Sequence, residues 1–531
     1  MFINSMPNRV QIQSNGAWLE LSGSEQGQVW ETGNTKVSLQ QSDQLLLLLH
    51  SPSEAVERVK FRWQIAVSDK LRIVNDHWER GYGDLEWRGL IAERVLPWYF
   101  LAYDGKTSYG CGVQTGANAF CFWQVDSNGI TLWIDVRSGG RGVQLGTRTL
   151  QMATVVTQEA VTEESQLFLF ARAFCQRLCP SPKRPSFPVY GGNNWYYAYG
   201  ESSHSEILKD AELMAELAKN ESNRPFMIID DGWQLCHDEP AYNGGPWSVS
   251  NSKFPNMEKL ASEMKQAGTR PGIWFRPLLT IEKTPENWIL RRGASGEKIL
   301  DPSVPEVLEK IRSDIKRLTA WGYQLLKHDF STYDLLGRYG WAMGWEITSS
   351  DWEFHDTSRT TAEIILDMYR AIAQAAGDAT VLGCNTIGHL SAGIFELQRT
   401  GEDTSGKYWE RTRLMGVNTL AFTMPKHGTF FDIDADCVGL TDQVLWHYNK
   451  QWLDLLSRSG TPLLVSVDHK AAGAEQREAL QQAFHHAASK QPVGEPLDWL
   501  HTTVPNKWKL MGETVQYDWY RNDGVMYYKK K

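Results

Sequence analysis

Residues 325–330 have the sequence Leu-Leu-Lys-His-Asp-Phe, in which an apolar run stops abruptly at a cation and a carboxylate. The run 323–326 is typical of a buried strand, and 331–332 (Ser-Thr) predicts a turn after it. Lys327 and Asp329 are two residues apart, so on a strand they point to the same face. A neighbouring lysine favours an ionised carboxylate, which suits a nucleophile, but this motif alone fits an ordinary structural ion pair equally well.

Alternating strands and helices are predicted on both sides of this motif. Strands are expected at 189–195, 226–230, 272–275, 324–327, 380–384, 395–398, 419–423 and 462–467. Amphipathic helices are expected at 205–219, 257–266, 305–321, 361–376 and 442–457. Eight strands with helices between them, over about 280 residues, fit a (β/α)8 TIM barrel, which typically needs about 250. An open doubly wound sheet is the alternative, but no glycine-rich phosphate-binding motif follows any of the strands.

The flanking regions are predicted to be β-rich. We expect an N-terminal antiparallel β-sandwich over residues 1–180, the catalytic barrel over 186–468 and a small β-rich C-terminal module over 469–531. The proline-rich segment between the first two suits a linker. Extended runs in the sandwich are expected at 36–40, 45–49, 59–67, 130–136 and 165–170. The C-terminal module is expected to hold a helix at 475–489 and strands at 514–520 and 525–528.

Composition narrows the class of partner. The net charge of −9 comes without a basic stripe, which argues against nucleic acid. No run approaches the roughly 18 apolar residues of a membrane span. Seven scattered cysteines do not resemble a disulfide framework, and Cys175 and Cys179 lack the second pair of ligands that a zinc site needs. The N-terminus lacks the features of a signal peptide, so we expect a cytoplasmic protein; a signal peptide removed earlier and a homo-oligomer both stay open.

Polar side chains follow several of the predicted strands. Asp230 and Asp231 end the second strand and are followed by Gly-Trp-Gln, and Asp403 lies in the loop after the sixth. Because catalytic groups of a TIM barrel emerge at the carboxyl ends of its strands, we expect these residues to share one pocket with Asp329. Further candidates at the strand ends are Trp195, Trp233, Trp274, Cys384, Arg399 and Asp434. Two carboxylates in a pocket rich in Asp, Arg, Lys and Trp are typical of a glycosidase active site.

The tryptophans, Cys384 and the aspartates at 432–436 also allow other interpretations. Most of the 23 tryptophans are expected in the core, although a flat indole face also suits the apolar face of a sugar ring. Cys384 would need an activating histidine to act as a nucleophile, and His389 is near in sequence, but a small buried thiol is the better interpretation. Alternating aspartates at 432–436 lack the glycine and glutamate of a calcium loop.

Three motifs together resemble the α-galactosidase (melibiase) clan, glycoside hydrolase families 27 and 36. They are Ile-Ile-Asp-Asp-Gly-Trp-Gln at 228–234, Leu-Leu-Lys-His-Asp at 325–329 and Arg-x-x-x-Asp at 399–403. Weaker echoes follow at 432–434 and 456–466, and Asn-Asn-Trp at 193–195 is similar to family 36. Family 36 members also carry an N-terminal β-sandwich, so this family is the closer one.

The resemblance implies a retaining α-glycosidase, in the first place an α-galactosidase acting on oligosaccharides, without a metal or organic cofactor. Asp329 matches the nucleophile and Asp403 the acid/base, with Glu402 as the rival for the second role. The two carboxyl groups are then expected at roughly 5–5.5 Å. Substrate contacts are implied or expected for Asp230, Asp231, Trp233, Lys327, Arg399, Cys384, Trp195, Trp274 and Asp434.

The acid role predicts that burial or the charge of Asp329 raises the pKa of Asp403. Two departures from the family pattern put the sugar in doubt: Arg276, which could accommodate an anionic substrate, and Asn385. A raffinose-synthase-type galactosyltransferase, an α-N-acetylgalactosaminidase and a catalytically silent sugar-binding protein are the alternative functions.

Overall fold

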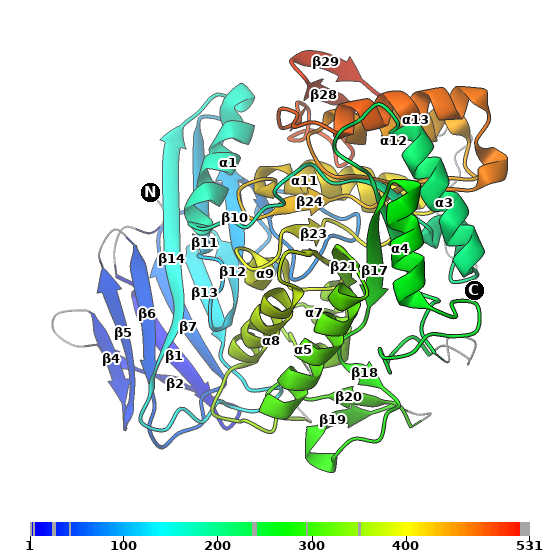
Figure 1. Cartoon of the computed structure of the whole chain (residues 1–531). Coiled ribbons are helices and arrows are strands. Elements are labelled where there is room, and N and C mark those ends of the chain that lie inside the picture. Colours follow the sequence, from blue (N-terminus) through cyan, green and yellow to red (C-terminus); the bar gives the residue numbers. More distant parts are fainter. Residues whose placement is uncertain are drawn as a thin grey trace.

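The structure is a computed structural model that describes residues 3, 6–23, 28–41, 44–235, 242–293, 296–348 and 352–520. The strand expected at 525–528 and Cys236, one of the seven cysteines, lie outside these residues. Figure 1 shows two antiparallel sheets on one side of the molecule and a curled parallel sheet, surrounded by helices, beside them.

The N-terminal region forms two antiparallel sheets. One has the order β2 (Ala17–Glu20), β1 (Arg9–Ser14), β7 (Arg58–Gln64), β13 (Gly129–Asp135), β12 (Phe120–Asp126) and β9 (Leu96–Pro97). The other has the order β3 (Ser22–Gly23), β4 (Val29–Thr32), β5 (Thr35–Gln41), β6 (Leu45–His50), β14 (Thr149–Val161), β11 (Thr107–Val113), β10 (Tyr99–Tyr103) and β8 (Arg72–Asn75). Side chains alternate between buried and accessible along β5, the pattern of a sheet with one face in the core. Phe100 of one sheet contacts the ring of Trp123 of the other at 5.9 Å between centroids.

The extended run predicted at 165–170 is wrong. These residues form η1 (Glu164–Gln166) and the start of α1 (Leu167–Leu178). Over the longer window the buried positions recur at helical spacing, which a window of six residues cannot reveal. Helix α1 packs on β11, where Gly110 leaves room for the ring of Phe174.

The parallel sheet holds nine strands in the order β24, β23, β22, β21, β17, β16, β15, β26 and β25. Their bounds are Tyr190–Asn193 (β15), Phe226–Ile229 (β16), Arg270–Phe275 (β17), Leu325–His328 (β21), Thr380–Gly383 (β22), Leu397–Arg399 (β23), Asp432–Asp434 (β24), Cys437–Leu440 (β25) and Leu463–Val467 (β26). The two outer strands, β24 and β25, are separated by only residues 435–436. Three Cα steps span at most about 11 Å, so the sheet curls round and its two edges approach each other. A mixed α/β fold with a curled parallel sheet is thus established, while the complete eight-stranded barrel stays a prediction.

The seventh predicted strand, 419–423, is wrong as well. It is helix α11 (Thr419–Thr423), and it continues a helical stretch formed by α10 (Trp409–Thr412) and η3 (Arg413–Asn418). Strand β24 takes the place expected for it. A run of five apolar or β-branched residues does not distinguish a strand from a buried helix. The other seven predicted strands each overlap a strand of the parallel sheet.

Helices cover the outside of the curled sheet, as Figure 1 shows. The five predicted ones correspond to α3 (His204–Leu217), α4 (Met257–Ala267), α5 (Pro305–Ala320), α8 (Thr361–Ala376) and α12 (Trp446–Arg458). After the last strand come α13 (Ala474–Ala487) and a small antiparallel sheet of β27 (Glu495–Pro496), β28 (Lys507–Leu510) and β29 (Glu513–Gln516). Among the helices described, none is long and apolar enough to cross a membrane. The domain boundaries stay predictions.

One loop of the N-terminal region, residues 76–88, is bonded to the segments that follow the strands of the parallel sheet. We call it the bridging loop. Asp76 forms a buried ion pair with Lys426, whose Nζ lies 2.6 Å from Oδ1. Gly81 donates to Thr400 at 2.8 Å, and Asn418 donates through Nδ2 to the carbonyl of Leu85 at 2.8 Å. The N-terminal sheets and the parallel sheet are therefore joined by polar contacts as well as by packing.

Replacing Lys426 with methionine is expected to lower the free energy of unfolding by about 3–5 kcal/mol, because Asp76 then stays buried without its cation. Urea unfolding of the whole chain measures this change. Lys450→Met is the matched control, since Lys450 pairs with Glu475 on the surface at 3.1 Å and both side chains are more than half exposed. An exposed pair contributes less than about 1 kcal/mol, so equal losses for the two variants would contradict a stabilising role of the buried pair.

Candidate active site

A cavity of about 230 Å³ lies at the carboxyl ends of the parallel strands. This is below the roughly 300–1,000 Å³ of pockets for drug-sized ligands, so it suits one small polar unit. It is lined by Arg80, Trp195, Asp230, Asp231, Asn243, Trp274, Lys327, Asp329, Phe330, Tyr339, Asn385, Glu402 and Asp403. Seven of the eleven predicted site residues are in this set. The remaining four, Trp233, Cys384, Arg399 and Asp434, are at most 1% exposed and lie behind the cavity wall.

Asp329 follows the last residue of β21, and its carboxylate is held by two donors. The backbone N–H of Phe330 donates to Oδ1 at 2.8 Å, and the indole Nε1 of Trp274 donates to Oδ2 at 3.1 Å. Phe330 has φ = 61°, a left-handed conformation that is uncommon for a bulky residue and that often accompanies functional sites. The turn therefore presents the Asp329 carboxylate to the cavity in a fixed orientation.

Lys327 pairs with Asp230 and not with its sequence neighbour Asp329. Its Nζ lies 2.6 Å from Oδ2 of Asp230, which also accepts from Nδ2 of Asn193 at 2.6 Å. Burial raises the pKa of Asp230, although Lys327 and Asn193 oppose this shift. Asn193 of β15, Asp230 directly after β16 and Lys327 of β21 thus form a buried polar triad, and Lys327 and Asp230 also line the cavity.

Asp231 lies beside this triad. It accepts hydrogen bonds from Gln234 and, at 3.4 Å, from Nδ2 of Asn243, which follows the sequence Asp-Asp-Gly-Trp-Gln at a distance of some ten residues. Trp233 of the same motif points away from the cavity: its Nε1 donates to the carbonyl of Trp274 at 2.9 Å, and its ring packs against Trp247. Trp233 therefore helps to hold Trp274 in place by this hydrogen bond. A contact between Trp233 and a sugar stays a prediction.

Asp403 is surrounded by cations. Nη2 of Arg399 lies 3.1 Å from its Oδ1, and Nε of Arg411 donates to its backbone carbonyl at 2.7 Å. Burial would raise the pKa of Asp403, but Arg399, Arg80, Lys327 and Arg411 together lower it to about 2. The expected raised pKa of Asp403 is therefore wrong, because the positive charge near it outweighs burial.

Arg399 is the centre of the buried charges behind the cavity. Besides Asp403, its Nη2 contacts Oδ2 of Asp436 at 2.6 Å, and its Nε lies 4.0 Å from Oδ2 of Asp434. Burial and the nearby Asp436 raise the pKa of Asp434 to about 6. Asp434 therefore binds a proton more readily than an ordinary carboxyl, and it lies behind the cavity wall.

Arg80 is a charged lining residue that sequence reasoning missed, as it also missed Asn243, Phe330 and Tyr339. It comes from the bridging loop, and its Nη1 donates to Sγ of Cys384 at 3.8 Å. The loop is held beside Asp403 by backbone bonds, since Gly81 donates to Thr400 and accepts from Glu402 at 3.0 Å. A Cβ on Gly81 would meet Thr419 at 2.8 Å, so only glycine allows this approach. The one available signal was a charged, glycine-containing segment, 79–83, inside the predicted sandwich.

Arg276 does not offer its charge to the cavity. Its guanidinium donates to both oxygens of the buried Asp334, at 3.0 Å from Nε, and stacks over Phe330 at 4.3 Å from the ring centroid. The charge of Arg276 is neutralised by Asp334, so Arg276 does not support the hypothesis of an anionic substrate. Asn385 does line the cavity, where its Nδ2 donates to Glu79 of the bridging loop at 2.6 Å.

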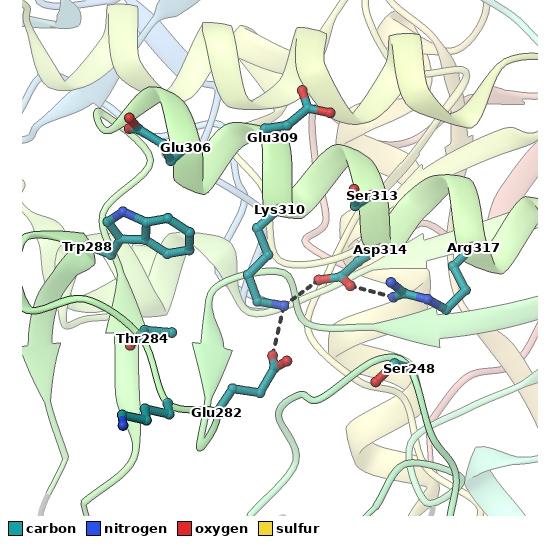
Figure 2. A pocket seen from close by; sticks show the side chains of 11 residues that line it. Ser248, Glu282, Thr284, Trp288, Glu306, Glu309, Lys310, Ser313, Asp314 and Arg317 are labelled. Atoms are coloured by element: carbon teal, nitrogen blue, oxygen red, sulfur yellow. Dashed lines mark hydrogen bonds and ion pairs between the residues drawn. The ribbon is translucent and has the colours of Figure 1, made fainter.

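A larger cavity, of about 550 Å³, lies against helix α5 and is shown in Figure 2. Lys310 is one of its lining residues, and the Nζ of Lys310 forms ion pairs with Glu282 at 2.7 Å and with Asp314 at 2.9 Å. Asp314 also pairs with Arg317 at 2.6 Å. These charges neutralise one another on the outer face of a helix, so this cavity is a weaker candidate than the smaller one at the strand ends.

Neither a thiol nucleophile nor a metal centre is indicated. Burial raises the pKa of the Cys384 thiol, and His389 directs Nε2 to the carbonyl of Val113 at 2.9 Å, in the N-terminal region. Burial also lowers the pKa of His389 to about 3. In the part of the chain that the structure describes, no three His, Cys, Asp or Glu side chains are grouped as metal ligands.

Cys384 is expected to resist alkylation in the native protein, because its thiol is buried and protonated. Iodoacetamide at pH 8 followed by peptide mass spectrometry measures the labelling, with the urea-unfolded chain as the control for intrinsic reactivity. Labelling of native Cys384 at the rate seen in the unfolded chain would contradict its placement behind the wall.

Comparison with known proteins points to one group. No family profile matches the chain. The α-galactosidase TtGalA of Thermus thermophilus superimposes with a TM-score of 0.59 at 17% identity, over 96% of this chain and 99% of that one. The family 36 α-galactosidase AgaA of Geobacillus stearothermophilus gives 0.62 at 13% identity, over 96% and 75%. The chain is similar in fold to the family 36 α-galactosidases.

The similarity in sequence is much more restricted. A curated α-galactosidase AgaA of Geobacillus stearothermophilus is 26% identical over 140 residues, which are 24% of this chain and 18% of that protein. The predicted resemblance to family 36 is confirmed, and it extends through the N-terminal sheets, since the superpositions cover nearly the whole chain.

Proposed function

We propose that this protein is a retaining α-glycosidase of the α-galactosidase type. The observation that carries the proposal is the presence of Asp329 and Asp403 on the wall of one small cavity, at the ends of different strands of a curled parallel sheet. Two carboxylates flanking one site are what the double displacement of a glycosidic bond requires. The buried pair of Lys327 and Asp230 beside them offers fixed polar atoms for sugar hydroxyls.

The comparisons support the choice of sugar. Structures similar to this chain include TtGalA bound to p-nitrophenyl α-D-galactopyranoside and the same enzyme bound to stachyose. Trp274 and Trp195 line the cavity, and an indole face packs well on the apolar face of a sugar ring. We therefore take a terminal α-galactoside as the substrate to test first.

Asp329 is the proposed nucleophile. Its carboxylate attacks the anomeric carbon, the bond to the leaving oxygen breaks, and a covalent glycosyl-enzyme forms. The two hydrogen bonds from Trp274 and the Phe330 amide orient the carboxylate, which avoids a cost of reorganisation during the attack.

Asp403 is the proposed partner in the second step. Water attacks the anomeric carbon while the ionised carboxylate of Asp403 takes a proton from it, and the sugar is released as Asp329 regains its charge. The cations that lower the pKa of Asp403 favour its ionised form, which is the form that can accept a proton. Glu402 also lines the cavity and pairs with Arg411 at 3.1 Å, as Asp403 pairs with Arg399, so variants of both carboxyls are needed to separate them.

Asp329→Asn is expected to lower kcat/KM for p-nitrophenyl α-galactoside by more than about 10⁴-fold, the upper end of what general acid–base catalysis alone contributes. The asparagine keeps the shape of the site, so galactose binding, measured by calorimetry, should persist. Turnover of the variant at a near-normal rate would remove Asp329 from the mechanism.

Asp403→Asn is expected to slow steady-state hydrolysis of the same substrate by roughly 10²–10⁴-fold, with a burst of one nitrophenolate per site, because the glycosyl-enzyme waits for a base. Azide needs no deprotonation and should restore turnover. Glu402→Gln is the matched neighbour and should show neither burst nor rescue. The reverse pattern in the two variants would transfer the role to Glu402.

A further inference from the structure

The cavity suits one sugar, so the rest of an oligosaccharide has to lie beyond its mouth. Its volume is about 230 Å³, and part of its wall is formed by deeply buried side chains such as Asp230 and Lys327. Other lining residues are partly exposed and mark the mouth, among them Asp329, Asp403 and Tyr339. The bond that is cleaved lies between the two proposed catalytic carboxyls. The second sugar of a substrate is therefore held at the mouth and not inside the cavity.

Tyr339 brings an aromatic ring to this mouth. Burial raises the pKa of the Tyr339 phenol to about 12, while the nearby Arg80 lowers it and Asp329 raises it further. The ring of Tyr339 stacks on Tyr333 with 4.7 Å between the centroids and an angle of 24° between the planes. Tyr333 is 38% exposed, so the stacked pair extends from the cavity wall to the surface of the protein.

The segment after Tyr339 is anchored on the bridging loop and exposes another large aromatic ring. The amide of Gly340 donates to Glu79 at 2.9 Å, and Nε1 of Trp78 donates to the carbonyl of Gly344 at 2.9 Å. Between these two bonds lies the short helix α7 (Gly340–Met343), which carries Trp341. Trp341 is 68% exposed. A large apolar ring is thus presented to solvent from a fixed position, two residues from the cavity wall.

We propose that Tyr339, Tyr333 and Trp341 form an aromatic rim that binds the second and third sugars of an oligosaccharide. The rim gives the protein a preference for α-galactosides that carry further sugars over those with a small aglycone. This inference rests on the proposed function and names its substrate class more closely. The flat faces of the rim residues suit the apolar faces of sugar rings. Because the segment is already anchored, ordering it costs little when a glycan binds.

Trp345 is the matched control for Trp341. It lies four residues further along the same segment and is 57% exposed. The guanidinium of Arg58 lies over its ring, 5.3 Å from the centroid. Arg58 belongs to β7 of the N-terminal sheets, so Trp345 packs toward that region and is not part of the rim.

The experiment compares methyl α-galactoside, melibiose and raffinose, in which one terminal α-galactose is followed by no, one and two further sugars. In the wild type, kcat/KM for galactose release should rise roughly 2- to 12-fold with each added sugar, the effect of one ring contact. Trp341→Ala should abolish the gain from melibiose to raffinose, and Trp341→Phe should keep part of it. Tyr333→Ala should reduce the gain from methyl α-galactoside to melibiose. Trp345→Ala should retain both gains.

Three outcomes overturn the rim and leave the glycosidase function intact. The first is equal kcat/KM for the three compounds in the wild type, and the second is an equal loss of the raffinose gain in Trp341→Ala and Trp345→Ala. The third is an unchanged series in Trp341→Ala. If light scattering then shows that Trp341→Ala changes the oligomeric state, the ring belongs to a contact between copies of this chain.

A binding measurement tests the rim without turnover. Calorimetry on Asp329→Asn should show tighter binding of raffinose than of methyl α-galactoside, and adding Trp341→Ala should reduce that difference. Absence of turnover by the wild type on every compound overturns the proposed function. Equal binding of the two ligands to Asp329→Asn, or no binding of either, overturns the rim.

Discussion

The arrangement at the strand ends depends on the buried ion pair between Lys327 and Asp230. Each charge would be costly alone at its depth, and the pair, joined by Asn193, is tolerable because every partner has a hydrogen bond of good length. The pair also links the strands β16 and β21, which are not neighbours, since β17 lies between them. It therefore fixes the curvature of the sheet at the place where Asp329 emerges, and the Trp274 indole on the intervening strand completes the support of that carboxylate.

Much of this site was predictable, because at several strand ends an apolar run is followed directly by a charged residue. The runs ending at Asp230 and Lys327 predicted both the strands and the shared cavity, because parallel strands of a barrel end at the same edge. The run 419–423 misled because its apolar content is as typical of a buried helix, and the helical stretch that precedes it contains no strong signal of its own.

What the sequence could not reveal depends on contacts between distant segments. Arg80 and Asp403 are far apart in the chain, and nothing in the segment around Arg80 indicates that it reaches a parallel sheet. The pairing of Lys327 with Asp230 in place of Asp329 also could not be predicted from the sequence. Two residues on one face of a strand are not required to bind each other. The raised pKa expected for Asp403 failed for this reason: it considered burial and the charge of Asp329, whereas two of the four cations that lower the pKa, Arg80 and Lys327, lie far from Asp403 in the sequence.

The charge balance around Arg399 decides what the site can do. Arg399 lies between Asp403, Asp434 and Asp436, and the carboxyl of Asp434, whose pKa is raised to about 6 by burial, can shed its charge near neutrality. When Asp434 is protonated, Arg399 has fewer anionic partners and its ion pair with Asp403 becomes stronger. The proton is then on a carboxyl that does not line the cavity. Arg399 therefore couples the charge of Asp403 on the cavity wall to the protonation of Asp434 behind it.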